Sequence, residues 1–211
     1  MKLFSKCKKI LQSSILVAGV AATGNVSAGL INSDFTDGLD GWGGDVAYYD
    51  LINNIDNDAF DVDFGDYPAN FSTGINSVTL NTSADNDNEY WGVYLFQSFM
   101  VDPNSSLLSL SFQSSADYAY LTLVDENFNL LHDFINDGLS VDISTYTGTN
   151  VSLEMGIEDW DFVLDDYLTV SNISISQNSV PVPEPSTFLL FSIALLAVRQ
   201  WSNKVNLTTQ H

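Results

Sequence analysis

Carboxylates are the side chains with which this sequence can do chemistry. Of its 27 Asp and Glu residues, 26 lie between Gly29 and Ser179. Carboxylate oxygens bind hard cations such as calcium, and a pair of carboxyl groups can cleave a glycosidic bond. The glutamates available for such a pair are Glu89, Glu126, Glu154 and Glu158. Among so many acids no pair stands out, so a carboxylate-based glycoside hydrolase is the least favoured function.

Residues for other kinds of catalysis are scarce. The single cysteine is Cys7, and the two histidines are His132 and His211. No serine-centred nucleophile motif accompanies His132, and the Cys and His patterns that bind zinc are lacking. We therefore expect that the protein is not an enzyme.

Basic residues are missing from the acidic segment. All six Lys and Arg lie before Gly29 or after Ser179, which leaves the residues between with a formal charge of −26 when His132 is neutral. Repulsion of this size opposes the compact state unless salt screens it or bound cations neutralise part of it. Nucleic acids and nucleotides, which are held through Lys and Arg, are excluded as partners.

The N-terminus has the parts of a secretory signal peptide. Four lysines within the first nine residues precede an apolar stretch, 10–22, and Val26-Ser27-Ala28 has the small residues of a cleavage site. We expect residues 1–28 to be the signal peptide and signal peptidase to cut after Ala28. The mature chain then begins at Gly29 and contains no cysteine.

Residues 29–179 are expected to form one acidic domain. In 108–112 and 151–157 every second residue is apolar, which is the pattern of a half-buried strand. The other predicted strands are 45–52, 60–64, 76–82, 89–101, 118–124, 128–134, 139–144 and 162–176. Strands at this spacing, separated by Asn, Asp, Gly and Ser clusters, predict an all-β fold, an antiparallel β-sandwich of the jelly-roll type.

A stem and an apolar segment follow the domain. Prolines keep the stem, 180–186, extended and accessible to a processing enzyme. The next segment, 187–201, is short for a bilayer span but contains an interfacial tryptophan, and we expect it to be a hydrophobic transmembrane helix. Arg199 near its end places the tail, 202–211, in the cytoplasm and the acidic domain outside.

Four residues of this region carry a resemblance to a known signal: Pro183, Glu184, Pro185 and Arg199. With the apolar segment between them they resemble the PEP-CTERM sorting signal of Gram-negative bacteria that make exopolysaccharide. The resemblance implies that an exosortase processes the protein, which is held transiently in the inner membrane and then delivered to the cell surface or the extracellular matrix. A glycosylphosphatidylinositol signal, the main alternative, ends in its apolar segment and does not continue past Arg199.

The domain has a second resemblance. Residues 32–39, followed by Gly41-Trp42, are similar to the first strand of carbohydrate-binding-module-like jelly rolls, and residues 162–166 are similar to the last strand. In those relatives the two strands meet at a structural calcium ion. The resemblance therefore implies a calcium site formed by Asp34, Asp37 and Asp165. Thr36 stands where the relatives commonly have an acidic ligand, and calcium is the only cofactor expected.

Aromatic side chains are the candidates for contact with a glycan, because their faces stack on sugar rings. Those that lie among Asn and Asp residues are Trp42, Tyr48, Tyr49, Tyr90, Trp91, Tyr118, Tyr120 and Trp160. The tryptophans of this group, Trp42, Trp91 and Trp160, are the predicted contacts. Most aromatics of a strand-rich domain nevertheless lie in its core or pack across strands.

Three functions follow, in order of preference. The first is an exported cell-surface or matrix protein with a structural or adhesive role in an exopolysaccharide biofilm. The second is a calcium-stabilised carbohydrate-binding module, and the third is the hydrolase. The expected partners are an exosortase, signal peptidase, the membrane through the C-terminal helix, and exopolysaccharide.

Overall fold

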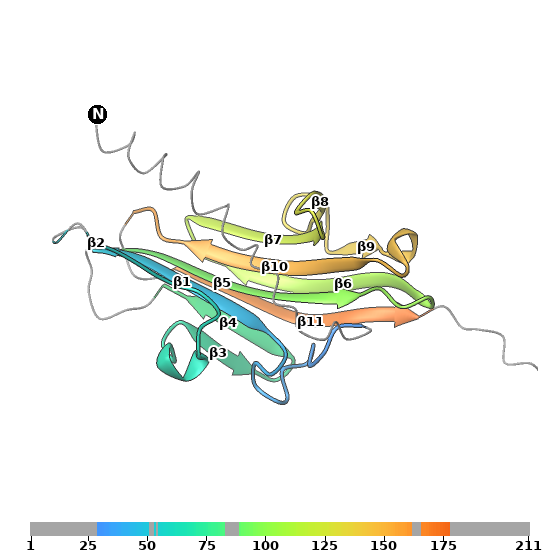
Figure 1. Ribbon diagram of the computed structural model, residues 1–211, viewed down its shortest axis with the longest axis horizontal. Coiled ribbons are helices and arrows are strands. Elements are labelled where there is room, and N and C mark those ends of the chain that lie inside the picture. Colours follow the sequence, from blue (N-terminus) through green and yellow to red (C-terminus); the bar gives the residue numbers. More distant parts are fainter. Residues whose placement is uncertain (1–28, 51–52, 54, 83–88, 162–165, 178–211) are drawn as a thin grey trace, which may run out of the picture. The chain divides into compact units, whose positions relative to one another are not determined.

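A computed structural model describes residues 29–50, 53, 55–82, 89–161 and 166–177. All of them belong to one compact unit of the chain, Met1–Asn178. Within them, eleven strands form two antiparallel sheets, and the only helices are two short 3-10 turns, η1 (Phe64–Asp66) and η2 (Ser144–Tyr146). The predicted all-β class and antiparallel sandwich are confirmed (Figure 1).

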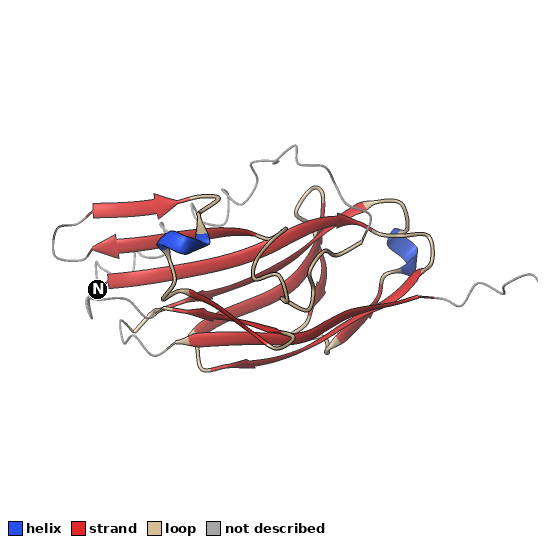
Figure 2. Ribbon diagram, turned by 90° about the horizontal axis from the view of Figure 1, so that it is seen from below, coloured by secondary structure: helices blue, strands red, loops and turns tan. Residues whose placement is uncertain are grey.

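The first sheet has six strands in the order β2-β1-β5-β10-β7-β8. Their bounds are β1 (Gly43–Asp50), β2 (Ile55–Ala59), β5 (Glu89–Met100), β7 (Tyr118–Asp125), β8 (Leu130–Asp133) and β10 (Asn150–Glu158). The second sheet has the order β3-β4-β11-β6-β9. Its strands are β3 (Phe71–Gly74), β4 (Ser77–Asn81), β6 (Ser105–Ser114), β9 (Ser140–Asp142) and β11 (Tyr167–Gln177). Central neighbours such as β5 and β10 are far apart in sequence, as in a jelly roll. Figure 2 shows the strands of the sandwich lying in two layers.

One hydrophobic core lies between the sheets, and strand periodicity builds it. In β5 every second residue from Trp91 to Phe99 points inward, and the inward residues of β10 alternate in the same way. Leu80 of β4 and Leu168 of β11, which are paired across the second sheet, are fully buried on the opposite side of this core. The alternation seen in the sequence therefore assigns core and surface on most strands.

A buried glutamine ties the N-terminal segment to the sandwich. Gln97 is 5% exposed on the inward side of β5. Its Oε1 accepts a hydrogen bond from the Ile31 amide at 2.6 Å, and its Nε2 donates to the carbonyl oxygens of Ile31 and Gly41. In the same N-terminal segment the ring of Phe35 stacks on the ring of Trp42, with the ring centroids 5.3 Å apart. An apolar side chain at position 97 would leave these backbone groups without their partner.

Two sequence predictions of strands are wrong. The segment 32–39 forms a series of turns, because Asn32, Phe35 and Gly38 adopt positive φ angles that no strand allows. Residues 60–64 lead through a bend into η1, since Asp61 also has a positive φ of 51° and its amide donates to Asp45 Oδ1. The short strands β2 and β3 were not predicted.

The carboxyl group of Glu154 gives the first testable prediction. Burial on the outward side of β10 raises the pKa of Glu154, while a hydrogen bond from Ser152 lowers it by less. A raised carboxyl pKa adds stability below the pKa of the unfolded chain, and this contribution is lost as pH rises through the folded value. Glu154→Gln is thus expected to raise the melting temperature at pH 7 by about 2–4 °C and to change it little near pH ~3.5.

Thermal melts at the two pH values check this, with Glu126→Gln as the matched control. Glu126 is an exposed glutamate in the turn after β7. An equal gain from both substitutions at pH 7 would mean that general charge reduction, and not burial of Glu154, is responsible.

Candidate functional site

Four aromatic side chains gather at one end of the outward face of the six-stranded sheet. They are Tyr94 of β5, Tyr118 and Tyr120 of β7, and Trp160 just after β10. Register brings them together, because Tyr94 and Tyr120 both pair with Gly156 while Tyr118 pairs with Glu158. We call these four residues the aromatic face.

A glycine creates the space for the two central tyrosines. A Cβ atom placed on Gly156 would lie 2.5 Å from the ring of Tyr120 and 2.6 Å from the ring of Tyr94, closer than real contacts allow. Both rings therefore lean over the bare backbone of β10, and their centroids are 6.1 Å apart at an interplanar angle of 27°. Larger residues at position 156 would force the rings apart.

Glu158 organises the polar atoms of the aromatic face. Its side chain is only 4% exposed. One carboxylate oxygen accepts a hydrogen bond from the Tyr94 hydroxyl at 3.2 Å, and the other accepts one from Trp160 Nε1 at 2.9 Å. In a segment without Lys or Arg, these aromatic donors take the place of a cationic partner.

The outermost aromatic pair is accessible to solvent. Tyr118 and Trp160 stack with centroids 5.3 Å apart and planes 12° from parallel, and they are 38% and 47% exposed. Burial and then the charges of Glu158 and Asp133 raise the pKa of Tyr118, and burial raises the pKa of Tyr120 well above its usual value. Both phenols therefore stay neutral hydrogen-bond donors at ordinary pH.

The two glutamates on this side of β10 are poorly spaced for cleavage of a glycosidic bond. Glu154 and Glu158 lie four residues apart on one strand, which is about 13 Å along it. Paired carboxyl groups of glycosidases are about 5–9.5 Å apart. Glu158 is also engaged by Tyr94 and Trp160. The arrangement is suited to holding a hydroxyl-rich ligand against aromatic rings.

The structure separates the three tryptophans predicted to contact a glycan. Trp42 and Trp91 lie in the core at 6% and 7% exposure, where Trp42 stacks on Phe35 and Trp91 stacks on Tyr48. Their rings are thus occupied by packing. Trp160 is the exposed member of the three, and glycan contact by Trp160 stays a prediction.

The structure describes only two of the three predicted calcium ligands, Asp34 and Asp37. Asp34 is exposed, and its Oδ1 accepts hydrogen bonds from the amide and hydroxyl of Thr36. Asp37 is also exposed, and its amide donates to Asn32 Oδ1. Asp165 lies outside the described residues. Calcium at this place therefore stays a prediction.

His132 lies on β8, where one ring nitrogen is 2.8 Å from the Gly138 carbonyl oxygen. The ring also meets Phe134 edge to face, with centroids 4.7 Å apart. Both contacts give this residue a structural role at the edge of the sheet.

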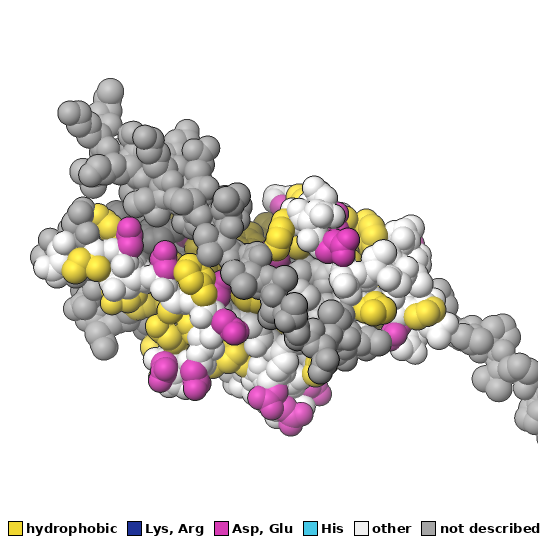
Figure 3. All heavy atoms as spheres, viewed as in Figure 1, with side chains coloured by type: hydrophobic (Ala, Val, Ile, Leu, Met, Phe, Trp, Pro, Cys, Tyr) yellow, Lys and Arg dark blue, Asp and Glu magenta, His cyan; other side chains and the backbone are white. Residues whose placement is uncertain are grey.

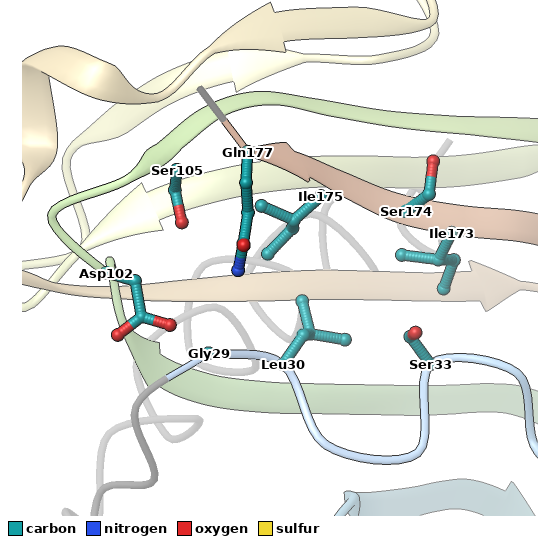
Figure 4. Close-up of a pocket in the computed structure, with 9 residues that line it drawn as sticks. All are labelled: Gly29, Leu30, Ser33, Asp102, Ser105, Ile173, Ser174, Ile175 and Gln177. Atoms are coloured by element: carbon teal, nitrogen blue, oxygen red, sulfur yellow. The ribbon is translucent and has the colours of Figure 1, made fainter. Parts of the chain in front are cut away.

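A cavity of about 270 Å³ lies near the C-terminal end of β11, beside the N-terminal segment. Leu30 from that segment and Ile173 and Ile175 from β11 point toward one another across it, and Asp102 lies at its rim (Figure 4). The lining mixes these three apolar side chains with polar ones, among them Ser33, Ser105 and Gln177. No residue of the aromatic face contributes to it.

Acidic side chains are spread over the surface in Figure 3 and are not gathered in one patch. Because residues 29–179 contain 26 Asp and Glu and no Lys or Arg, the domain has a negative potential that disfavours anionic ligands.

The predicted targeting segments lie outside the described residues. They include the cleavage site at Ala28, the sorting residues Pro183, Glu184, Pro185 and Arg199, and the helix 187–201. Among the described residues, no helix is long and apolar enough to cross a membrane.

Comparison with known protein families identifies a motif in the C-terminal segment. A model of the PEP-CTERM protein-sorting motif matches residues 181–204. The chain carries a PEP-CTERM sorting motif. The resemblance inferred from Pro183-Glu184-Pro185 and Arg199 is thereby confirmed, and a PEP-CTERM motif implies an exported protein that an exosortase sorts.

The domain was compared with curated proteins and with solved structures. No curated protein matches the sequence. Among the solved structures that match is TmCBM61 in complex with beta-1,4-galactotriose, at 10% sequence identity and a TM-score of 0.42. The match covers 71% of this chain and 97% of that one.

The contact between Gly156 and the tyrosines gives a second prediction. Gly156→Ala is expected to displace the rings of Tyr94 and Tyr120 and to destabilise the domain by about 1–3 kcal/mol, as overpacking does. Chemical denaturation measures the loss, and Ser98→Ala, an exposed position on β5, is the control. A Gly156→Ala variant as stable as the control would show that the tyrosines do not depend on the bare backbone.

Proposed function

We propose that this exported PEP-CTERM protein binds an uncharged glycan of the extracellular matrix through its aromatic face. The observation that carries the proposal is the exposed Tyr118–Trp160 stack beside a buried glutamate that already orients aromatic donors. Flat rings provide stacking surface for the apolar faces of sugars, the exposed Tyr118 phenol provides a hydrogen-bonding group, and Glu158 holds Trp160 in place through its Nε1.

The charge of the domain supports the choice of an uncharged ligand. A domain with 26 acidic residues and no Lys or Arg repels polymers that carry uronic acid or sulfate groups. A neutral polysaccharide pays no such electrostatic penalty and can be bound through stacking and hydroxyl contacts alone.

An adhesive role follows from combining this binding with export. A protein that is sorted outward by an exosortase and that binds exopolysaccharide can connect the cell surface with the matrix, or strands of the matrix with one another. We place the protein in such a biofilm setting, with a structural or adhesive function and not a catalytic one.

Replacing the exposed tryptophan tests glycan binding. In affinity electrophoresis through gels containing neutral exopolysaccharide, Trp160→Ala is expected to weaken retardation about tenfold or more, the effect of losing ~1.4 kcal/mol of binding energy. Phe128→Ala is the matched control, because Phe128 is 54% exposed and lies in the loop after β7, at the opposite end of that strand from Tyr118. Unaltered binding in Trp160→Ala, or an equal loss in both variants, would refute the proposed site.

Replacing the stem motif tests sorting separately. Changing Pro183, Glu184 and Pro185 together to alanine is expected to leave the protein in the inner membrane, because the exosortase no longer recognises the stem. Cell fractionation with immunodetection of the domain measures the distribution between membrane, surface and medium. Normal release of this triple variant would contradict exosortase sorting, and it would leave glycan binding by the domain unaffected.

A further inference from the structure

At one end of the sandwich, each sheet is extended by one further backbone hydrogen bond that involves an aspartate. In the second sheet, the ladder between β4 and β11 is extended by Thr82, whose amide donates to the carbonyl of Asp166 at 3.1 Å. In the first sheet, the ladder between β5 and β10 is extended by Asp159, whose amide donates to the carbonyl of Trp91 at 2.9 Å. Side chains alternate along a strand, so Asp159, two residues after the inward Ile157, and Asp166, two residues before the inward Leu168, also point inward.

These two aspartates meet a third from the loop between β6 and β7. Carboxylate oxygens of Asp117, Asp159 and Asp166 all lie within 4.8 Å of one another. Asp159 and Asp166 are 0% and 5% exposed, whereas Asp117 is exposed. We call these three residues the aspartate cluster. Two buried carboxylates so close together repel each other strongly unless a cation or protons lie between them.

Unsatisfied polar atoms mark the same place. Asp166 Oδ1 accepts a hydrogen bond from the Asp117 amide at 3.1 Å, but Oδ2 is buried and has no partner among the described residues. The hydroxyl of the fully buried Thr82, next to Asp166 across the sheet, likewise has no partner there. Buried polar groups are rarely left so, and an ion or ordered water is the usual explanation.

The electrostatics of Asp166 agree with this geometry. Burial, and then the charges of Asp117, Asp159 and Asp161, raise the pKa of Asp166 to about 6, against the lowering effect of the Asp117 amide. The carboxylate is therefore held in an environment that disfavours its charged form when no cation is present.

We propose that the aspartate cluster binds a calcium ion, with Thr82 Oγ1 as a neutral ligand. The donors are all oxygens, which suits a hard cation and not zinc. Calcium–oxygen distances are about 2.3–2.6 Å, so ligand atoms on one ion are up to about 5 Å apart. The carboxylate oxygens of the aspartate cluster, all within 4.8 Å of one another, meet this limit. The site is distinct from the one predicted at Asp34, Asp37 and Asp165.

Calcium here would also hold the exposed part of the aromatic face. Asp117 and Asp159 directly precede Tyr118 and Trp160, the two stacked residues. An ion shared by both aspartates fixes the two chain segments relative to each other and so maintains the stack. This coupling rests on the proposed glycan-binding function, whereas the ion site itself does not.

Calcium titration of the intact protein tests the site. Calcium chloride added to chelator-treated protein at constant ionic strength is expected to give saturable binding by calorimetry and to raise the melting temperature, because it binds only the folded state. Magnesium at the same concentration is expected to give a smaller shift. Asp166→Asn and Asp117→Asn are each expected to weaken calcium binding about tenfold or more.

Matched variants separate this site from general charge screening. Asp56→Asn removes one exposed carboxylate from β2 and is expected to retain full calcium binding. In chelator, Asp166→Asn is expected to melt higher than the wild type, since a repelling charge is removed. An absence of saturable calcium binding, or equal loss in Asp56→Asn, would overturn the proposal. Loss of calcium binding in Asp34→Asn but not in Asp117→Asn or Asp166→Asn would overturn it in favour of the other site.

Discussion

The sandwich is built under one constraint: none of its carboxylates has a lysine or arginine to pair with. The structure meets this constraint with neutral donors. Asp125, Asp133 and Asp142 each accept hydrogen bonds from backbone amides and from a nearby Asn or Ser side chain, and these bonds contribute to a lowered pKa at all three. Acidic residues at turns thus stabilise the loops that connect the strands.

The same constraint shapes two of the places where acids are buried. At the aromatic face, Glu158 is satisfied by a phenol and an indole, and this arrangement orders rings that would otherwise be loose on the surface. At the aspartate cluster the neutral donors do not suffice, because Asp166 keeps an unsatisfied oxygen. The first arrangement leaves the stacked rings of Tyr118 and Trp160 accessible to solvent, and the second leaves close carboxylates whose repulsion a cation would relieve.

The sequence predicted those parts of the molecule that depend on local periodicity. Alternation identified the long central strands, but it also occurred at 60–64, where the positive φ of Asp61 turns the chain instead. The strand β2, with sequence IDNDA, was missed because its polar edge position leaves no apolar pattern. Aromatic identity could not distinguish Trp91 in the core from Tyr94 on the surface, although their odd spacing on one strand places them on opposite faces. The aspartate cluster could not be predicted at all, because strand pairing and a loop bring its members together.

The absence of cations has a consequence for survival outside the cell. Endopeptidases of the trypsin type cut only after lysine or arginine, and no such residue occurs between Lys9 and Arg199. The whole sandwich and the stem that follows it are therefore closed to this class of protease, in the unfolded chain as much as in the folded one. Transient unfolding of the domain outside the cell therefore exposes no new cleavage site to trypsin-type proteases.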